Sequence, residues 1–147
     1  MKCLVLENKK CTITSGYGQR KLNGKYDYHY GIDIVMEGYK LDYIIAHSDG
    51  IVVNLVDNKI NNKGSGSYGN YVKIKHKSGY STLYAHMATG LLVKIGEKVC
   101  KGQRIGYMSD SGDAYGKHLH FEVYFKNNPI NPLNVFNKEI GEIKETI

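Results

Sequence analysis

Residues 117–125 read Lys117-His118-Leu119-His120-Phe121-Glu122-Val123-Tyr124-Phe125, and this stretch decides how the rest of the sequence is interpreted. Side chains of a β-strand alternate between its two faces with a period of two residues. One face therefore carries the apolar residues Leu119, Phe121, Val123 and Phe125, and the other carries His118, His120 and Glu122. The alternation predicts a strand that contributes to a core on one face and to a polar pocket on the other.

The polar face of this strand allows more than one role. Imidazole is a common zinc ligand and the usual general acid or base near neutral pH. A lone His-x-His pattern is equally typical of two half-exposed surface histidines. Glu122 is either an acceptor for an imidazole N–H or an exposed surface residue. The rest of the sequence has to distinguish these interpretations.

A second polar pair, His29 and Asp33, lies in the alternating segment 28–35. In an extended strand their Cα atoms would be ~13 Å apart, at or beyond the reach of two side chains onto one ion. The backbone must therefore bend or bulge between them for joint ligation, and Gly31 is the residue that permits it. The other interpretation is a surface histidine beside an unrelated acid.

Three further histidines differ in their surroundings. His86 ends the alternating run 80–87 and shares a face with Tyr84, so its imidazole is expected beside a polar, tyrosine-rich wall. His47 precedes a turn, and His76 stands between lysines at a hairpin tip. Both of these are expected to be exposed.

Length and composition predict one all-β domain. A chain of 147 residues suits a single domain and can bury a core without disulfides. The 17 Gly, 13 Tyr and only 2 Pro suggest many short strands joined by glycine turns. We expect an antiparallel β-domain over residues 1–132 with its core at 14–125. From residue 133 to 147, apolar residues recur every three or four positions and predict a short C-terminal helical tail.

Turn residues between apolar runs predict the strand pairs. Expected hairpins join 3–6 to 11–14, join two strands within 43–56 around Ser48-Asp49-Gly50, and join 72–76 to 80–86. Residues 91–95 and 103–108 are expected to add two strands. The polar, glycine-rich stretch from Asn58 to Gly69 is predicted to be a loop.

The net charge of +6, from 20 Lys and Arg against 14 Asp and Glu, favours anionic partners. Nucleic acid, an anionic membrane and an anionic cell-wall polymer all fit, and charge alone does not choose among them. Cys3, Cys11 and Cys100 lack the C-x-x-C spacing of a thiolate metal site. Folding in a reducing compartment is the simpler interpretation, with a Cys3–Cys11 pair left open.

Five motifs resemble, in order, those of the lysostaphin-type zinc endopeptidases, the peptidoglycan hydrolases of bacterial autolysins and phage lysins. The resemblance extends from Thr14 to Pro132. It is carried by Thr14 to Arg20, Ala46 to Val52, Gly79 to His86, Gly96 to Gly106 and Asn131-Pro132, together with His29-x-x-x-Asp33 and His118-Leu119-His120-Phe121-Glu122.

The resemblance implies one zinc ion with His29, Asp33 and His120 as its ligands. It implies that His86 and His118 are unligated catalytic histidines beside an open substrate groove. The function implied is zinc-dependent hydrolysis of peptide bonds in peptidoglycan, in the stem peptide or the cross-bridge. Three protein ligands leave one tetrahedral position open, as in catalytic zinc sites.

Other classes of protein account for fewer residues. A non-catalytic wall-binding or activating module of the same fold remains the alternative, although the complete ligand set argues against it. A biotinyl or lipoyl carrier resembles the stretch from Gly96 to Gly106, but no suitably flanked lysine is present. A nucleic-acid binder accounts only for the charge.

The expected place of action follows from the N-terminal sequence. Residues 1–10 are charged early and lack a long apolar run, so no signal peptide is expected, and no stretch suits a membrane span. We expect a monomer made in the cytoplasm that reaches the wall after release by a holin or as part of a virion, and a host enzyme exported by an unusual route is the alternative. Its positive charge would favour the anionic wall.

Overall fold

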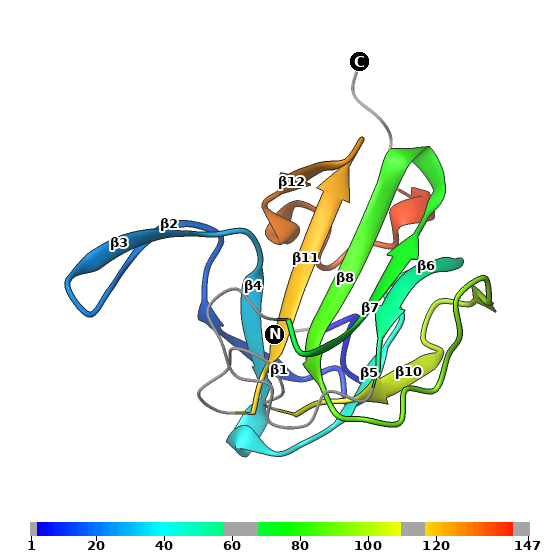
Figure 1. Cartoon of the computed structure of the whole chain (residues 1–147), viewed down its shortest axis with the longest axis horizontal. Coiled ribbons are helices and arrows are strands. Elements are labelled where there is room, and N and C mark those ends of the chain that lie inside the picture. Colours follow the sequence, from blue (N-terminus) through cyan, green and yellow to red (C-terminus); the bar gives the residue numbers. More distant parts are fainter. Residues whose placement is uncertain (1–2, 58–67, 110–116, 143–147) are drawn as a thin grey trace.

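The computed structural model describes residues 3–57, 68–109 and 117–142, and these form an antiparallel β-domain (Figure 1). No α-helix occurs in these three ranges, where the helical elements are 3-10 turns at Glu37–Tyr39, Lys77–Gly79, Pro132–Asn134 and Ile140–Glu142. The all-β prediction is confirmed. None of the described helices is long and apolar enough to cross a membrane.

Strand β11 (Leu119–Phe125) lies inside the main sheet, in which every neighbouring pair is antiparallel. Across the sheet the order is β1 (Cys11–Ser15), β4 (Ile32–Met36), β11, β8 (Tyr80–Met87), β7 (Asn70–Lys75), β6 (Gly50–Val56) and β9 (Lys98–Val99), with β12 (Asn128–Ile130) also paired to β11. The predicted β7–β8 hairpin is present, and its turn contains Ser78 and Gly79 with positive φ.

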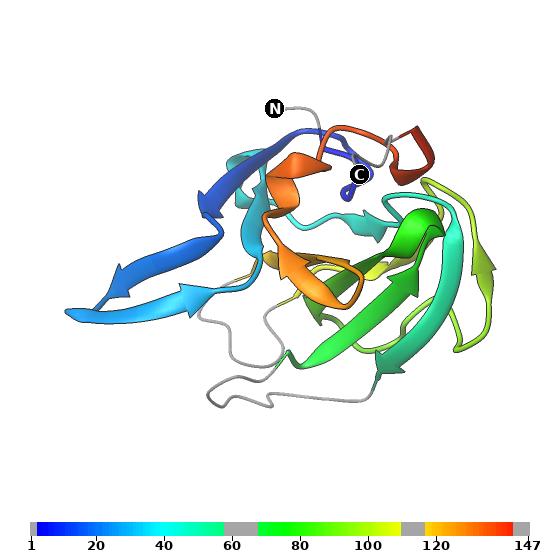
Figure 2. The same cartoon turned by 90° about the horizontal axis from the view of Figure 1, so that it is seen from above.

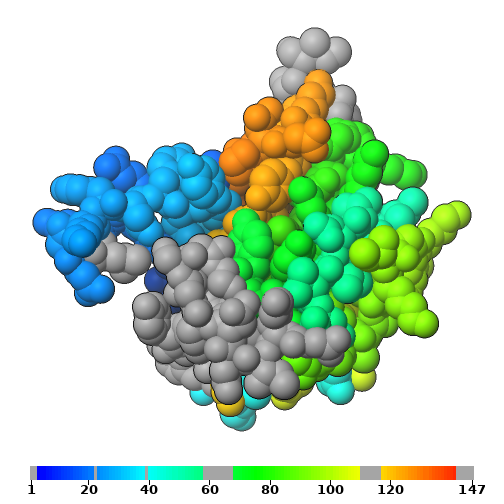
Figure 3. All heavy atoms as spheres, viewed as in Figure 1, coloured from blue at the N-terminus to red at the C-terminus, as the bar shows by residue number. Residues whose placement is uncertain are grey.

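Two smaller sheets flank the main one. Strand β5 (Tyr43–Ile45) pairs with β10 (Arg104–Tyr107). Strands β2 (Gly18–Leu22) and β3 (Lys25–His29) form a two-stranded ribbon that projects from the body, as Figures 2 and 3 show. The ribbon joins the body where β3 ends and β4 begins.

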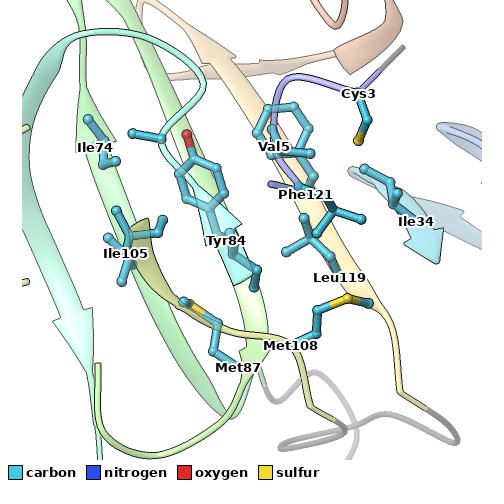
Figure 4. Packing of buried hydrophobic residues seen from close by; sticks show 14 of the residues in the cluster. Cys3, Val5, Ile34, Ile74, Tyr84, Met87, Ile105, Met108, Leu119 and Phe121 are labelled. Carbon is cyan, nitrogen blue, oxygen red and sulfur yellow. The ribbon is translucent and has the colours of Figure 1, made fainter. Parts of the chain in front are cut away.

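The apolar face of β11 lies in the core, as its alternation predicts. Leu119, Phe121 and Val123 are fully buried. They belong to one apolar cluster with Ile44 of β5 and Ile105 of β10. Figure 4 shows Leu119, Phe121 and Ile105 within this cluster. Each fully buried side chain of this size contributes about 1.5–3 kcal/mol. The other face of β11 is thereby free to carry polar residues.

Two predicted pairings and one predicted strand are wrong. β1 pairs with β4 rather than with residues 3–6, and β5 pairs with β10 rather than with β6. Residues 91–95 form no strand. The turn after β5 is held instead by the carboxylate of Asp49, which accepts the backbone N–H of Lys101 at 2.7 Å. Local alternation identifies a strand but not its distant partner.

The predicted tail helix is also wrong over residues 133–142, and residues 143–147 lie outside the described part. Val135, Phe136 and Ile140 are buried. The first two follow the 3-10 turn Pro132–Asn134, and the third begins the 3-10 turn Ile140–Glu142. Hydrogen bonds to residues distant in the sequence take the place of the backbone hydrogen bonds that a helix would have. The Val135 carbonyl accepts from His47 Nε2 at 2.9 Å, and the Ile140 N–H donates to Ser48 Oγ at 2.8 Å.

His47 and His76 are buried, contrary to the prediction that both are exposed. His47 Nε2–H donates to Val135, so its Nδ1 accepts from the Ser48 hydroxyl at 2.8 Å. His76 Nδ1–H donates to the Asp49 carbonyl, and its Nε2 accepts from Thr82 Oγ1 at 2.7 Å. Both rings are neutral parts of a satisfied polar network. The cysteines, Cys3 and Cys11 buried and Cys100 exposed, are free thiols.

These two histidines predict a loss of stability in acid. Burial lowers the pKa of His47 to about 4 and also lowers the pKa of His76. The unfolded chain, with histidine pKa values of about 6.5, therefore takes up protons first, and stability is lost as the pH falls from about 6.5 toward 4. For His47 the loss is on the order of 3 kcal/mol.

Urea unfolding at pH 7.5 and pH 4.5, with a chelator present, measures this loss. The His47→Gln variant keeps a donor and an acceptor but has no imidazole to titrate. It should show a smaller difference between the two pH values than the wild type. An equal difference would contradict the assignment of the acid sensitivity to His47.

Candidate metal centre

His29, Asp33 and His120 meet where three strands come together. His29 ends β3, Asp33 lies in β4, and Tyr30 and Gly31 interrupt the two strands, so the expected bend is present. In the sheet register, Asp33 is the direct partner of His120 on β11. The three side chains offer ligand atoms that all lie within 4.8 Å of one another.

These three atoms form a nearly equilateral triangle. His29 Nε2 lies 3.1 Å from His120 Nδ1 and 3.3 Å from Asp33 Oδ1. His120 Nδ1 lies 3.2 Å from Asp33 Oδ1. Zinc bonds of about 2.0–2.2 Å place tetrahedral ligands roughly 3.3–3.6 Å apart. The triangle therefore matches one face of a zinc tetrahedron to within a few tenths of an ångström.

The other nitrogen of each imidazole is already occupied. His29 Nδ1–H donates to the Gly16 carbonyl at 2.9 Å, which leaves Nε2 directed at the triangle. His120 Nε2 lies 2.7 Å from Glu122 Oε2, which leaves Nδ1 for a metal. Such outer hydrogen bonds fix the tautomer and the ring orientation of a ligating histidine.

The electrostatics of the site favour the ionised form of the Asp33 carboxylate. Burial raises the pKa of Asp33, but hydrogen bonds from His118, His120 and His29 outweigh it and hold that pKa well below its usual range. Burial lowers the pKa of His120, but hydrogen bonds to Asp33 and Glu122 raise it to about 9. Asp33 is therefore ionised at neutral pH and available to a cation.

His118 and His86 lie beside the triangle. His118 Nε2 is 3.5 Å from Asp33 Oδ1. The His86 ring centroid is 4.9 Å from that of His118 and 5.8 Å from that of His120. The structure thus brings together all five residues singled out in the sequence.

His86 reaches the site because β8 contains a bulge. Asn70 pairs with Met87 and Val72 with Tyr84, so two residues of β8 lie opposite Tyr71 alone. His86 has a φ of 60°, and its N–H donates to the Tyr68 carbonyl at 2.8 Å. Bulges of this kind re-aim a side chain.

The expected tyrosine-rich wall beside His86 is correspondingly wrong at Tyr84. Tyr84 is fully buried in the core with Phe121, and its ring centroid lies 5.3 Å from that of Phe121. Its hydroxyl accepts the His47 N–H at 3.0 Å. Simple alternation placed Tyr84 and His86 on one face, and the bulge separates them.

The sequence indicated no individual role for Arg20 and Tyr124. It left open whether Tyr68 lines a peptide groove and whether Glu122 accepts an imidazole N–H. Arg20 Nη1 donates to Ser15 Oγ at 2.8 Å and lies 3.7 Å from Asp33 Oδ2. Glu122 is buried rather than surface-exposed. Tyr124 continues the polar face of β11, so the alternation itself could have identified it. The predicted loop from Asn58 to Gly69 lies outside the described residues except for Tyr68 and Gly69.

Comparison with known proteins assigns this fold to a family of metallopeptidases. A model of peptidase family M23 matches residues 27–132, and the chain belongs to this family of peptidoglycan endopeptidases. The peptidoglycan DD-endopeptidase ShyA of Vibrio cholerae is 33% identical over 129 residues, which are 86% of this chain and 28% of that protein. The chain spans about a third or less of the length of such curated relatives.

Solved structures agree with this assignment. The catalytic domain of the antimicrobial peptidase lysostaphin from Staphylococcus simulans superposes with a TM-score of 0.70 at 26% identity, covering 90% of this chain and 96% of that one. A mutant catalytic domain of EnpA, a prophage-encoded M23 protein of Enterococcus faecalis, gives a TM-score of 0.67 at 30% identity, covering 86% and 92%. The resemblance to lysostaphin-type enzymes is confirmed.

Gly31 provides a test of how tightly β11 and the bend fit. A Cβ at this position would lie 2.5 Å from the Phe121 carbonyl oxygen and 2.9 Å from Glu122 Cγ. Close approach to β11, rather than a positive φ, is thus the reason for glycine here. We expect Gly31→Ala to destabilise the fold by about 1–3 kcal/mol and to weaken metal binding.

Urea unfolding and metal titration of Gly31→Ala measure both effects. Gly141→Ala is the matched control, because a Cβ there would meet nothing within 4 Å. Wild-type stability and metal binding in Gly31→Ala would show that β11 does not restrict this bend.

Proposed function

We propose that this domain is a zinc-dependent endopeptidase that hydrolyses peptide bonds in bacterial peptidoglycan. The observation that carries the proposal is the triangle of His29, Asp33 and His120 with two further imidazoles beside it, in a chain of family M23. Three metal ligands by themselves would also be consistent with a metal of purely structural role. The additional pair of histidines supports hydrolysis.

His29, Asp33 and His120 would hold the zinc through the three atoms of the triangle. Bound there, zinc would polarise a peptide carbonyl and lower the pKa of a water molecule. His86 and His118 have no place among the ligand atoms, and their rings lie next to each other. One neutral imidazole would accept a proton and pass it to the leaving amine, and the other, as imidazolium, would stabilise the developing oxyanion.

The likeness to a prophage-encoded relative supports a phage or prophage lysin as the source. Such a protein would reach the wall by release through a holin or on a virion, and a host enzyme exported by another route is the alternative. The net charge of +6 supports attraction to an anionic wall. A non-catalytic wall-binding or activating module of the same fold is the alternative, and the experiments below separate it from an enzyme.

Digestion of purified peptidoglycan tests the activity directly. Sacculi with direct cross-links and sacculi with glycine cross-bridges are incubated with the zinc-loaded chain, and the products are read by mass spectrometry. We expect new amino termini in one of the two substrates, loss of cleavage with a chelator, and recovery with added zinc. Binding to sacculi without any new amino terminus would favour the non-catalytic module.

Substitutions separate ligands from proton-handling residues. Asp33→Ala and His120→Ala should lose both zinc and cleavage. His86→Ala and His118→Ala should keep near-stoichiometric zinc but lose roughly 10²–10⁴-fold in rate, since this is the usual contribution of one general acid or base. Metal analysis and cleavage rates are measured on the same samples. Zinc lost in His118→Ala and kept in His120→Ala would mean that these two histidines have exchanged roles.

A further inference from the structure

Glu122 places a buried carboxylate directly behind the proposed metal ligand His120. Its residue exposure is 2%. Oε2 lies 2.7 Å from His120 Nε2, the ring nitrogen that faces away from the triangle. The Tyr68 hydroxyl donates to the carboxylate at 2.9 Å, and the Tyr124 hydroxyl donates to Oε1. Three donors from three residues thus converge on one carboxylate.

We propose that Glu122, held by Tyr68 and Tyr124, is a positioning residue that keeps His120 Nε2 protonated and aims Nδ1 at the metal. The proposal rests on the metal site of the proposed function and deepens it. An ionised carboxylate is only an acceptor, so the N–H has to be on His120 Nε2. The lone pair of Nδ1 then points into the triangle. A carboxylate behind a ligating imidazole also raises the basicity of that ligand.

The two tyrosines keep the carboxylate in place. Burial, together with the charge of Glu122, raises the pKa of Tyr68 to about 12 and raises the pKa of Tyr124 as well. Both hydroxyls therefore remain protonated donors at neutral pH. They come from two different segments: Tyr124 is two residues after Glu122 on the same face of β11, and Tyr68 lies just before β7. Without them, a buried carboxylate with a single partner would be costly.

Tyr68 extends this arrangement to the second half of the site. Its backbone carbonyl accepts the His86 N–H at 2.8 Å, at the residue whose φ is 60°. The Tyr68 ring centroid also lies 5.9 Å from that of His120. Glu122 therefore positions a metal ligand directly and, through Tyr68, supports the backbone that presents His86.

Zinc affinity in the absence of substrate tests the proposal. Competition with a chromogenic chelator is measured for Glu122→Ala and for the isosteric Glu122→Gln. We expect roughly 10–100-fold weaker zinc binding for Glu122→Ala, the range usual for outer-shell partners of metal ligands, and a smaller loss for Glu122→Gln. Glu37→Ala, which removes the same charge from an exposed position, is the matched control and should bind zinc as the wild type does.

A spectroscopic readout distinguishes positioning from general stabilisation. In the zinc-loaded protein, the His120 Nε2–H should give a far-downfield proton resonance that is protected from exchange with solvent. Glu122→Gln should shift it and shorten its protection while circular dichroism shows an unchanged fold. Tyr124→Phe should shift it in the same direction by less.

The outcomes separate this inference from the proposed activity. Wild-type zinc affinity in Glu122→Gln together with an unshifted His120 resonance would overturn the positioning role. Should Glu122→Ala fail to fold, the isosteric Glu122→Gln decides the question. Weakened zinc binding in a chain that cleaves no peptidoglycan would uphold the positioning role and overturn the proposed activity.

Discussion

The alternation of β11 between its two neighbours is the constraint on which the rest of the structure depends. β4 on one side and β8 on the other fix its register, with His120 opposite both Asp33 and Ala85. A shift by one residue would exchange the two faces of the strand and place imidazoles in the core. The burial of Phe121 and its neighbours therefore supplies the precision with which His120 meets Asp33. The same strand, β11, therefore contributes both to the stability of the core and to the geometry of the candidate site.

Much of this arrangement could be predicted from the sequence because it depends on local periodicity. The two faces of β11 follow from a period of two, and the break at Gly31 follows from the distance between His29 and Asp33. What could not be predicted depends on contacts distant in sequence. The bulge that redirects His86 is set by pairing with β7, and the burial of His47 is set by the tail at Val135. Neither leaves a local signal.

The site also shows how a charged cluster can be kept within a small β-domain. Asp33 and Glu122 lie on opposite sides of the His120 ring, at 3.2 and 2.7 Å from its two nitrogens. Buried ionic groups are costly unless their partners are complete, and here each carboxylate has several donors. The candidate ligands are thus already oriented, so binding of a cation would require little reorganisation. A proton on His120 Nδ1 would compete with the metal for the same position.

The left-handed backbone at His86 has a consequence for how such domains diverge. A bulky residue at a φ of 60° costs of order 1–3 kcal/mol, which glycine would not incur and asparagine would reduce. Replacement of this imidazole by either residue would trade turnover for a more relaxed fold. Relief of this backbone strain would therefore favour a domain that keeps its fold and loses the imidazole. A chain of this fold that only binds would lie one substitution away from one that cleaves.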